Sequence, residues 1–356
     1  MSSRPPPPVW RSTLYVPGNV AKFIDKAHER GADCVLVDLE DSVPLAQKPE
    51  ARAMLAETMK KVVRGGADVA VRINRPLRLA IPDIEAAVRP GLSALFITKT
   101  EGVQHLRLLD EMVTELERER GMPVGGVGFA AMIEHPRALT QIHDIAEHGP
   151  RVIAMMLGGE DFALETGSIP SDESLELPKR LVAFAAQAHG VSMMGILGTV
   201  ADYSDPTAYR KSAERARRFG FSGGTCIHPG LVQALNQAFT PTADEVAYAR
   251  KLIAADEKAA AEGRGSFSVD GKMIEGIRSH LFSALRDIIF TYHKLVEHQH
   301  FDLGSGAGIT DTVFRILRNA GVVSSNLPPR LVVCWGGHSI SRGEYDFSKE
   351  VGYQLG

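Results

Sequence analysis

The sequence predicts a (β/α)8 barrel, and three observations carry the prediction. Eight short apolar runs follow one another through residues 11–240, each of the kind that forms a strand buried on both faces. Helix-like segments separate these runs, and a strand–helix unit repeated eight times is the pattern of a parallel sheet that closes into a barrel. Charged residues gather where the strands end, which is the end that carries the active site in such a barrel.

The expected strands are rich in Val, Ile, Leu and Met. They cover residues 11–18, 33–43, 68–76, 94–102, 127–134, 152–161, 191–200 and 223–230. We expect helices over residues 47–64, 101–119, 136–148, 176–189 and 207–219, and a first helix that Asn19 caps and that ends at Gly31. The rival architecture, a doubly wound sheet, calls for a GxGxxG phosphate loop after the first strand, and the segment GNVAKF does not supply one.

The chain divides into four segments. Residues 1–10 form a proline-rich arm, residues 11–240 the barrel, and residues 241–276 a C-terminal helix with an acid-bearing loop. Thr242 and Glu245 have capping-box spacing at the start of that helix. Residues 277–356 carry helical patterns and then the strand-like run LVVCW before a glycine turn. No further strand pattern follows, so the sequence predicts an incomplete Rossmann-like β–α fragment there.

Composition narrows the function classes. A formal net charge of -3 gives no overall electrostatic case for binding nucleic acid or a membrane surface. No apolar run approaches the roughly 18 residues that a transmembrane helix requires. The three cysteines lie in apolar runs without CxxC spacing, which favours buried thiols in a reducing compartment over a disulfide or zinc framework. We therefore expect a cytoplasmic protein.

Two acidic positions predict a metal site. Glu134 ends the fifth apolar run, and Asp161, preceded by Glu160, ends the sixth. A carboxylate at the end of a buried strand needs a cation beside it. Two such groups about one βα repeat apart offer oxygen ligands on rigid supports, which suits a hard divalent cation. The pattern therefore predicts Mg2+, with Mn2+ as an alternative, bound by Glu134 and by Glu160 or Asp161; ordinary salt bridges are the competing interpretation.

Many ordered motifs resemble one family over about the first 275 residues, the citrate lyase β-subunit-like, malyl-CoA lyase and citramalyl-CoA lyase branch of the HpcH/HpaI aldolase superfamily. The resemblance implies a Mg2+-dependent barrel that cleaves or forms a C–C bond next to a CoA thioester, with release of glyoxylate or pyruvate and an acyl-CoA. It also implies a homo-oligomer, commonly a trimer or hexamer, because an acid-bearing loop crosses between subunits. The motifs are RSTLYVPGN, VLVDLEDSV, VRIN, the lysine of FITK, MIEHPRAL, LGGEDFALETG, FGFSGGTCIHPGLVQALNQAFTPT and VDGKMIE.

The same resemblance assigns roles to individual residues. Glu134 and Asp161 match the metal ligands, and Arg72, whose guanidinium fork suits a carboxylate, matches the residue that binds the substrate carboxylate. Among Asp38, Glu40 and Asp41 we expect one acid to bond Arg72 or a metal-bound water, and we assign Asp38 a catalytic role. The remaining expected substrate contacts are Lys99, Arg11 (to substrate or to a CoA phosphate) and the backbone at Gly158 and Gly159, although Arg72 and Lys99 could also serve as structural ion-pair partners.

Two departures put full activity in question. The lyases carry an aspartate after KMI that serves as the catalytic acid or base from a neighbouring subunit, whereas this chain has Glu275, whose extra methylene moves the carboxyl by about 1 Å. Residues 277–356 resemble part of the LOG-like nucleotide 5′-monophosphate nucleosidases but lack their PGGxGT-type motif. The leading hypothesis is thus an acyl-CoA lyase; the alternatives are a metal-dependent 2-keto-3-deoxy acid aldolase and an inactive hybrid with a barrel scaffold.

Overall fold

The structure, a computed structural model, describes residues 7–198 and 204–275, and the chain forms two compact units, Met1–Phe239 and Thr240–Gly356. Most of the expected proline-rich arm and the whole expected fragment 277–356 lie outside the described residues. None of the described helices is both long and apolar enough to span a membrane.

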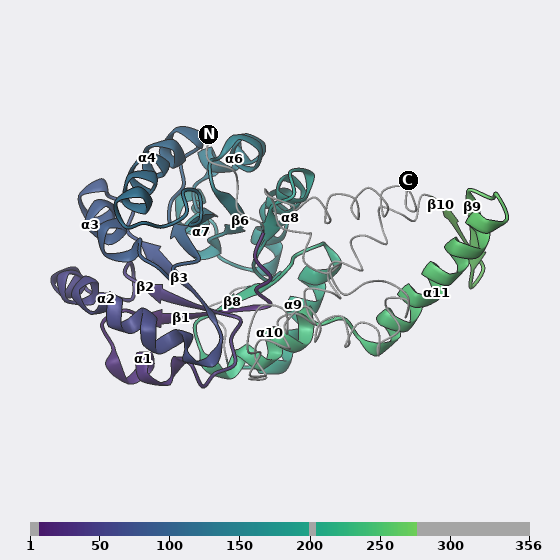
Figure 1. Cartoon of the computed structure of the whole chain (residues 1–356), viewed down its shortest axis with the longest axis horizontal. Coiled ribbons are helices and arrows are strands. Elements are labelled where there is room, and N and C mark those ends of the chain that lie inside the picture. The colour runs from purple at the N-terminus through teal and green to yellow at the C-terminus, as the bar shows by residue number, and fades with distance from the viewer. Residues whose placement is uncertain (1–6, 199–203, 276–356) are drawn as a thin grey trace. The chain divides into compact units, whose positions relative to one another are not determined.

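The first unit is built on one curled sheet of eight parallel strands in the order β7-β6-β5-β4-β3-β2-β1-β8 (Figure 1). Just beyond the two outermost strands of that order, Met194 and Gly223 form a parallel bridge, so the sheet closes into a barrel. The predicted (β/α)8 fold is confirmed. The strands are β1 (Ser12–Pro17), β2 (Cys34–Asp38), β3 (Asp68–Ile73), β4 (Ala94–Ile97), β5 (Gly128–Ile133), β6 (Val152–Leu157), β7 (Ser192–Met193) and β8 (Gly224–Cys226).

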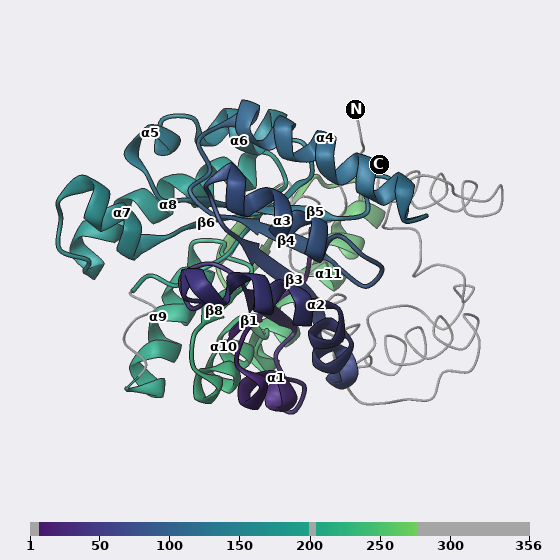
Figure 2. The same cartoon turned by 90° about the vertical axis from the view of Figure 1, so that its left-hand side faces the viewer.

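Helices follow the strands and lie outside the sheet (Figures 1 and 2). They bury one apolar face against the outward-pointing strand residues, as amphipathic helices of such a barrel must. The helices are α1 (Ala21–Ala27), α2 (Lys48–Val62), α3 (Leu77–Ala87), α4 (Val103–Glu119), α5 (Pro136–Leu139), α6 (Ile142–His148), α7 (Gly159–Thr166), α8 (Asp172–Ala188), α9 (Pro206–Arg218) and α10 (Val232–Phe239).

Strand alternation separates two apolar layers. On β2, Leu36 belongs to the cluster inside the barrel, whereas Val35 and Val37 belong to the larger cluster between sheet and helices. The same period of two places Ala70, Phe96, Met132 and Met156 of the neighbouring strands inside the barrel. Both faces of each strand are thus buried, which explains the uninterrupted apolar runs of the sequence.

Two predictions about the first helix are wrong. Helix α1 begins at Ala21 after Val20, and Asn19 instead donates a side-chain hydrogen bond to Gln47, so Asn19 is not the N-cap. The helix also ends at Ala27, before Gly31. Helices α3, α7 and α10 were not among the expected helices, and the expected strand over residues 152–161 extends into α7, which begins at Gly159. Helix α3 contains Pro82, which removes one intrahelical hydrogen bond.

The second unit contains α11 (Ala243–Ala261) and an antiparallel hairpin of β9 (Ser266–Val269) and β10 (Lys272–Glu275). The predicted capping box is present: the backbone N–H of Thr242 donates to Oε2 of Glu245 at 2.7 Å, and the backbone N–H of Glu245 donates to Oγ1 of Thr242 at 3.2 Å. Phe267 and Val269 of the hairpin pack against Ala259 of the helix. Glu275 is the last residue of β10.

Candidate active site

A cavity of about 470 Å3 opens at the carboxyl ends of the barrel strands. Its polar lining continues the inward-facing positions of the strands, two residues beyond the last apolar layer. Asp38 follows Leu36, Arg72 follows Ala70, and Glu134 follows Met132 at this spacing, and all three line the cavity. Because side chains alternate along a strand, the charged residues two positions after the apolar layer also point into the barrel, where they form a charged site above the core.

Glu134 is the most deeply buried acid of the predicted metal pair, with 3% of its surface exposed. The backbone N–H of Lys99 donates a short hydrogen bond to its Oε2. Burial nevertheless raises the pKa of Glu134 to about 8, since burial and the charges of the nearby acids Asp161 and Glu40 outweigh the hydrogen bond and charge of Lys99. A carboxyl group in this state is poised to exchange its proton for a metal ion.

Gly158 makes room for that carboxyl group. A Cβ on Gly158 would stand 2.4 Å from Cγ and 2.6 Å from Oε1 of Glu134, well inside contact distance. The backbone N–H of Gly158 also donates to the carbonyl of Ile133 at 3.0 Å, which holds the two strand ends together. The neighbouring Gly159 opens α7, where a Cβ would stand 2.9 Å from Cδ1 of Leu175. Both predicted glycines therefore lie at the cavity, where they allow close packing.

Lys99 joins two acids of the site. Its backbone is left-handed, with φ of 47°, a strained conformation for a lysine. From there Nζ lies 3.0 Å from Oε1 of Glu40 and 3.3 Å from Oδ2 of Asp161. Burial lowers the pKa of Lys99, but the hydrogen bond and charge of Glu40 outweigh burial, so the pKa lies above its ordinary value. Lys99 thus remains charged and holds Asp161 toward the barrel.

Arg72 and Asp38 form a bidentate pair. Nε and Nη2 of Arg72 each lie 2.7 Å from an oxygen of Asp38, and Nη1 lies 2.9 Å from Oε2 of Glu40. The guanidinium also stacks over the ring of Tyr15, 5.0 Å from its centroid. Burial alone would raise the pKa of Asp38, but the hydrogen bonds and charge of Arg72 hold it below the usual range. Asp38 therefore fixes the orientation of Arg72, as we expected of one acid in this cluster.

The donor set fits a hard divalent cation. The cavity lining and the residues that form ion pairs with it carry more acidic than basic side chains. The acids are Asp38, Glu40, Asp41, Glu134, Glu160 and Asp161, and the bases are Arg72, Lys99 and Lys179. No group of three or more His, Cys, Asp or Glu residues in the described part of the chain is arranged to hold a metal ion. Glu134 and Asp161 supply two carboxylates, which is the number that Mg2+ ordinarily takes from a protein, with water and substrate completing its octahedron.

Arg11 is not part of this constellation. It precedes β1, at the amino end of the sheet, whereas the cavity lies at the carboxyl end. Its Nε and Nη2 each lie 2.8 Å from an oxygen of Asp33, and the side chain is buried. The expectation that Arg11 binds substrate is corrected: its guanidinium is taken up by Asp33, which precedes β2.

Glu275 belongs to the second unit, so its predicted catalytic role stays a prediction. Tyr15 and Lys179 line the cavity and were not predicted. Tyr15 occupies an inward-facing position of β1, and the period of two that identifies Asp38 and Arg72 could have indicated it. Lys179 comes from α8 and carries no comparable signal, because a lysine on an amphipathic helix normally points to solvent.

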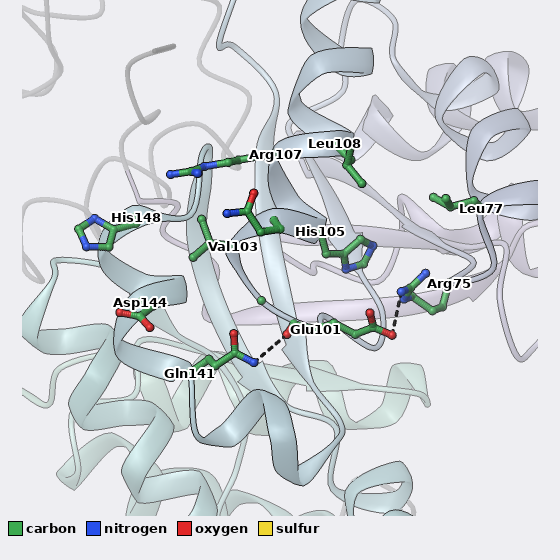
Figure 3. Close-up of a pocket in the computed structure, with 12 residues that line it drawn as sticks. Arg75, Leu77, Glu101, Val103, His105, Arg107, Leu108, Gln141, Asp144 and His148 are labelled. Carbon is green, nitrogen blue, oxygen red and sulfur yellow. Dashed lines mark hydrogen bonds and ion pairs between the residues drawn. The ribbon is translucent and has the colours of Figure 1, made fainter.

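A second pocket, of about 590 Å3, is lined by residues of α3, α4 and α6 and of the loops that precede them (Figure 3). Its chemistry is less suited to catalysis. Arg75 and Glu101 form an ion pair of 2.8 Å, and Gln141 donates to the carbonyl of Glu101 at 3.1 Å. Its other acid, Asp144, lies apart from Glu101 (Figure 3). Because its two carboxylates do not converge, we assign the candidate active site to the smaller cavity.

Comparison with known proteins agrees with this fold. Residues 11–229 match the family model of HpcH/HpaI aldolase/citrate lyase, and residues 259–295 match a model described as pyrimidine/purine nucleotide 5′-monophosphate nucleosidases. The chain is 30% identical to the citrate lyase subunit beta of Leuconostoc mesenteroides subsp. cremoris, over 74% of this chain and 88% of that protein. It is 32% identical to a (3S)-malyl-CoA thioesterase of Cereibacter sphaeroides, over 77% and 92% respectively.

A solved structure shows the same likeness. The protein CitE from Mycobacterium tuberculosis, in complex with magnesium, acetoacetate and coenzyme A, superposes with a TM-score of 0.59 at 25% identity. The match covers 80% of this chain and 98% of that one. The matched family model spans more than half of the chain and includes every strand of the barrel. The chain therefore belongs to the HpcH/HpaI aldolase/citrate lyase family.

Proposed function

We propose that this protein is a Mg2+-dependent carbon–carbon lyase that acts on a 3-hydroxyacyl-CoA thioester of the malyl-CoA, methylmalyl-CoA or citramalyl-CoA type. Its products are glyoxylate or pyruvate and an acyl-CoA. The observation that carries the proposal is the position of Glu134 and Asp161 at one cavity, beside two cationic side chains. The relative crystallised with magnesium and coenzyme A supports the same substrate class.

Glu134 and Asp161 would hold the metal. Bound there, Mg2+ would act as a Lewis acid toward the oxygens of the 2-hydroxy acid part of the substrate; Mn2+, which prefers the same oxygen ligands, could replace it. Lys99 would hold Asp161 in place, and the space beside Gly158 would let the carboxyl group of Glu134 face the cavity.

Arg72 would bind the substrate carboxylate. A guanidinium has five N–H donors, and those of Nε, Nη1 and one of Nη2 serve Asp38, Glu40 and Asp41. A second N–H remains on Nη2. Because Asp38 fixes the plane of the guanidinium, this donor would be presented to the substrate without loss of side-chain entropy on binding.

The reaction is a cleavage between the hydroxyl-bearing carbon and the carbon next to the thioester. A base removes the hydroxyl proton, the C–C bond breaks, and the electron pair becomes the thioester enolate, which takes a proton to give the acyl-CoA. We assign the proton donor to Glu275, supplied by a neighbouring copy in a homo-oligomeric, trimeric or hexameric, cytoplasmic enzyme. The longer side chain would slow this step, since a displacement of about 1 Å can cost on the order of 100-fold in rate.

The test is the release of glyoxylate from malyl-CoA and of pyruvate from citramalyl-CoA, with and without Mg2+, by the full chain, Glu275→Asp and Glu134→Gln. We expect Mg2+-dependent release that rises with Glu275→Asp and is lost in Glu134→Gln. Free thiol should be followed alongside, because hydrolysis of the thioester would liberate CoA instead of an acyl-CoA.

Three other results would contradict the proposal. Cleavage of 2-keto-3-deoxy acids without any response to CoA thioesters would identify the metal-dependent aldolase. No turnover by the chain or by Glu275→Asp, with folding and Mg2+ binding intact, would identify the inactive hybrid. Turnover that is indifferent to Mg2+ and to Glu134→Gln would remove the metal pair from the mechanism.

A further inference from the structure

Lys179 is a buried lysine that forms no ion pair with a carboxylate in the described part of the chain, although the charges of Asp172 and Glu160 act to raise its pKa. It lies on α8 with 6% of its surface exposed, and its Nζ donates a short hydrogen bond to the carbonyl of Gly198. That carbonyl is the one polar contact which the described residues give it. Burial lowers the pKa of Lys179 to about 8. An ammonium group buried with so little compensation is costly, so a further partner is to be expected.

The exposed part of Lys179 faces the candidate active site. Lys179 lines the cavity together with Gly159 and Glu160. Its Cε lies 3.8 Å from the position that a Cβ on Gly159 would occupy, so the side chain crosses the turn between β6 and Asp161. Lys48 offers a contrast: it is equally buried, but it gives its Nζ to two carbonyls, those of Leu39 and Glu40, at 2.7 Å each, and does not line the cavity.

The other two cations of the site each form ion pairs with acids of the protein, and Arg72 keeps one N–H of Nη2 for a ligand. Arg72 holds Asp38 and Glu40, and Lys99 holds Glu40 and Asp161. The ammonium group of Lys179 has three N–H donors, one of which serves Gly198. An anionic group in the cavity would satisfy the remaining two.

We propose that Lys179 is a substrate-binding residue that donates to the carboxylate of the 2-oxo acid, as a second cationic contact beside Arg72. This inference rests on the proposed function, because it takes the 2-oxo acid and the Mg2+ site from it. The ammonium group sets a preference for substrates with a carboxylate at this position. Its bond to Gly198 aims it, so that the lysine is preorganised before the substrate arrives.

The experiment uses oxalate, a planar dianion of the size of a 2-oxo acid, and calorimetric titration in two steps. Mg2+ alone is titrated first, and oxalate is then titrated into the Mg2+-saturated protein. The proteins are the full chain, Lys179→Met, Lys179→Arg and the control Lys211→Met, which removes an exposed lysine of α9. We expect unchanged Mg2+ affinity in all four. Oxalate should bind Lys179→Met about 10- to 100-fold more weakly, the effect of losing one hydrogen bond to a charged group, while Lys179→Arg keeps most of the affinity.

A second measurement separates contact with the ligand from a purely structural role. Acetic anhydride is reacted with the Mg2+-loaded wild-type chain, and acetylation of each lysine is followed by mass spectrometry. Oxalate should slow acetylation of Lys179 and leave that of Lys211 unchanged. A lysine that only supports Gly198 would react at the same rate with and without oxalate. If Lys179→Met fails to fold, this wild-type measurement decides the question.

Different results would contradict the role of Lys179 and the proposed function. Equal oxalate affinity in the wild type and Lys179→Met, or no protection of Lys179 by oxalate, would overturn the role of Lys179 and leave the proposed function standing. If the folded wild type bound neither Mg2+ nor oxalate, the proposed function would fall, and the role of Lys179 with it.

Discussion

The side chain of Glu134 fills the space that a side chain on Gly158 would need: a Cβ on Gly158 would stand 2.4 Å from Cγ of Glu134. The two residues end neighbouring parallel strands, β6 and β5, at inward-facing positions. The side chain of one therefore lies across the backbone of the other. The position of Glu134, the predicted metal ligand, therefore depends on a glycine at position 158 after the neighbouring strand.

Gly158→Ala should weaken Mg2+ binding about 10- to 100-fold, the range found when groups that orient a metal ligand are changed. The backbone at Gly158 has φ of -78°, which alanine adopts freely, so the effect comes from the clash alone. The matched control is Gly167→Ala, at φ of +67° with open space around it. That variant should lose about 1 kcal/mol of stability from backbone strain and bind Mg2+ normally. Equal Mg2+ affinity in Gly158→Ala and the wild type would contradict the account.

The metal-free protein should lose stability as the pH rises from about 5 to 8. Burial raises the pKa of Glu134 from 4.5 to about 8. Between these values the folded protein holds a proton that the unfolded chain has released, so the free energy of unfolding falls with pH by at most about 1.4 kcal/mol per unit. Denaturant unfolding with a chelator present, at several pH values, measures the slope. The wild type should fall more steeply than Glu134→Gln; parallel curves would show that Glu134 titrates normally.

Asp38→Asn should destabilise the protein by about 3 kcal/mol, because it leaves the buried guanidinium of Arg72 without its bidentate partner. Asp41 provides the control. It lies 3.4 Å from Nη1 of Arg72 with 64% of its side chain exposed, and exposed pairs contribute less than about 1 kcal/mol. Denaturant unfolding of both variants at neutral pH makes the comparison. Similar losses in the two would show that Asp38 does not fix Arg72.

Arg11→Met should reduce stability while leaving ligand binding intact, because the pair of Arg11 and Asp33 lies at the amino end of the sheet. Removing one partner of a buried pair costs about 3 kcal/mol. Oxalate titration of the folded, Mg2+-loaded variant should match the wild type, whereas Arg72→Met should bind oxalate more weakly. Loss of oxalate binding in Arg11→Met would restore its predicted role as a substrate ligand.

The sequence predicts those features of the site that follow from strand periodicity. Apolar runs identify the strands, and the acids or bases that end them must lie at one end of a parallel barrel. Glu134 and Arg72 could be found in this way. The spacing of two residues from the apolar layer even indicates which charged residues face inward, and it would have added Tyr15.

Other features depend on packing and backbone geometry, which periodicity does not report. Lys99 reaches Asp161 from a left-handed backbone that a lysine seldom adopts. Lys179 enters the cavity because α8 packs against the turn after β6. Helix α3 is hard to predict because it contains Pro82, and a proline usually ends a helix. Arg11 was misassigned because a charged residue beside a strand has the same local sequence signal at either end.

The most direct test of the account is calorimetric titration of Mg2+ into the wild type, Glu134→Gln and Asp161→Asn, with Glu101→Gln as the control from the second pocket. Circular dichroism should first establish that all four are folded. The account predicts that the wild type and Glu101→Gln bind one Mg2+ per chain with the same affinity, and that Glu134→Gln and Asp161→Asn lose most of it. Undiminished binding in both site variants, or no binding by the wild type, would contradict the assignment of the metal site.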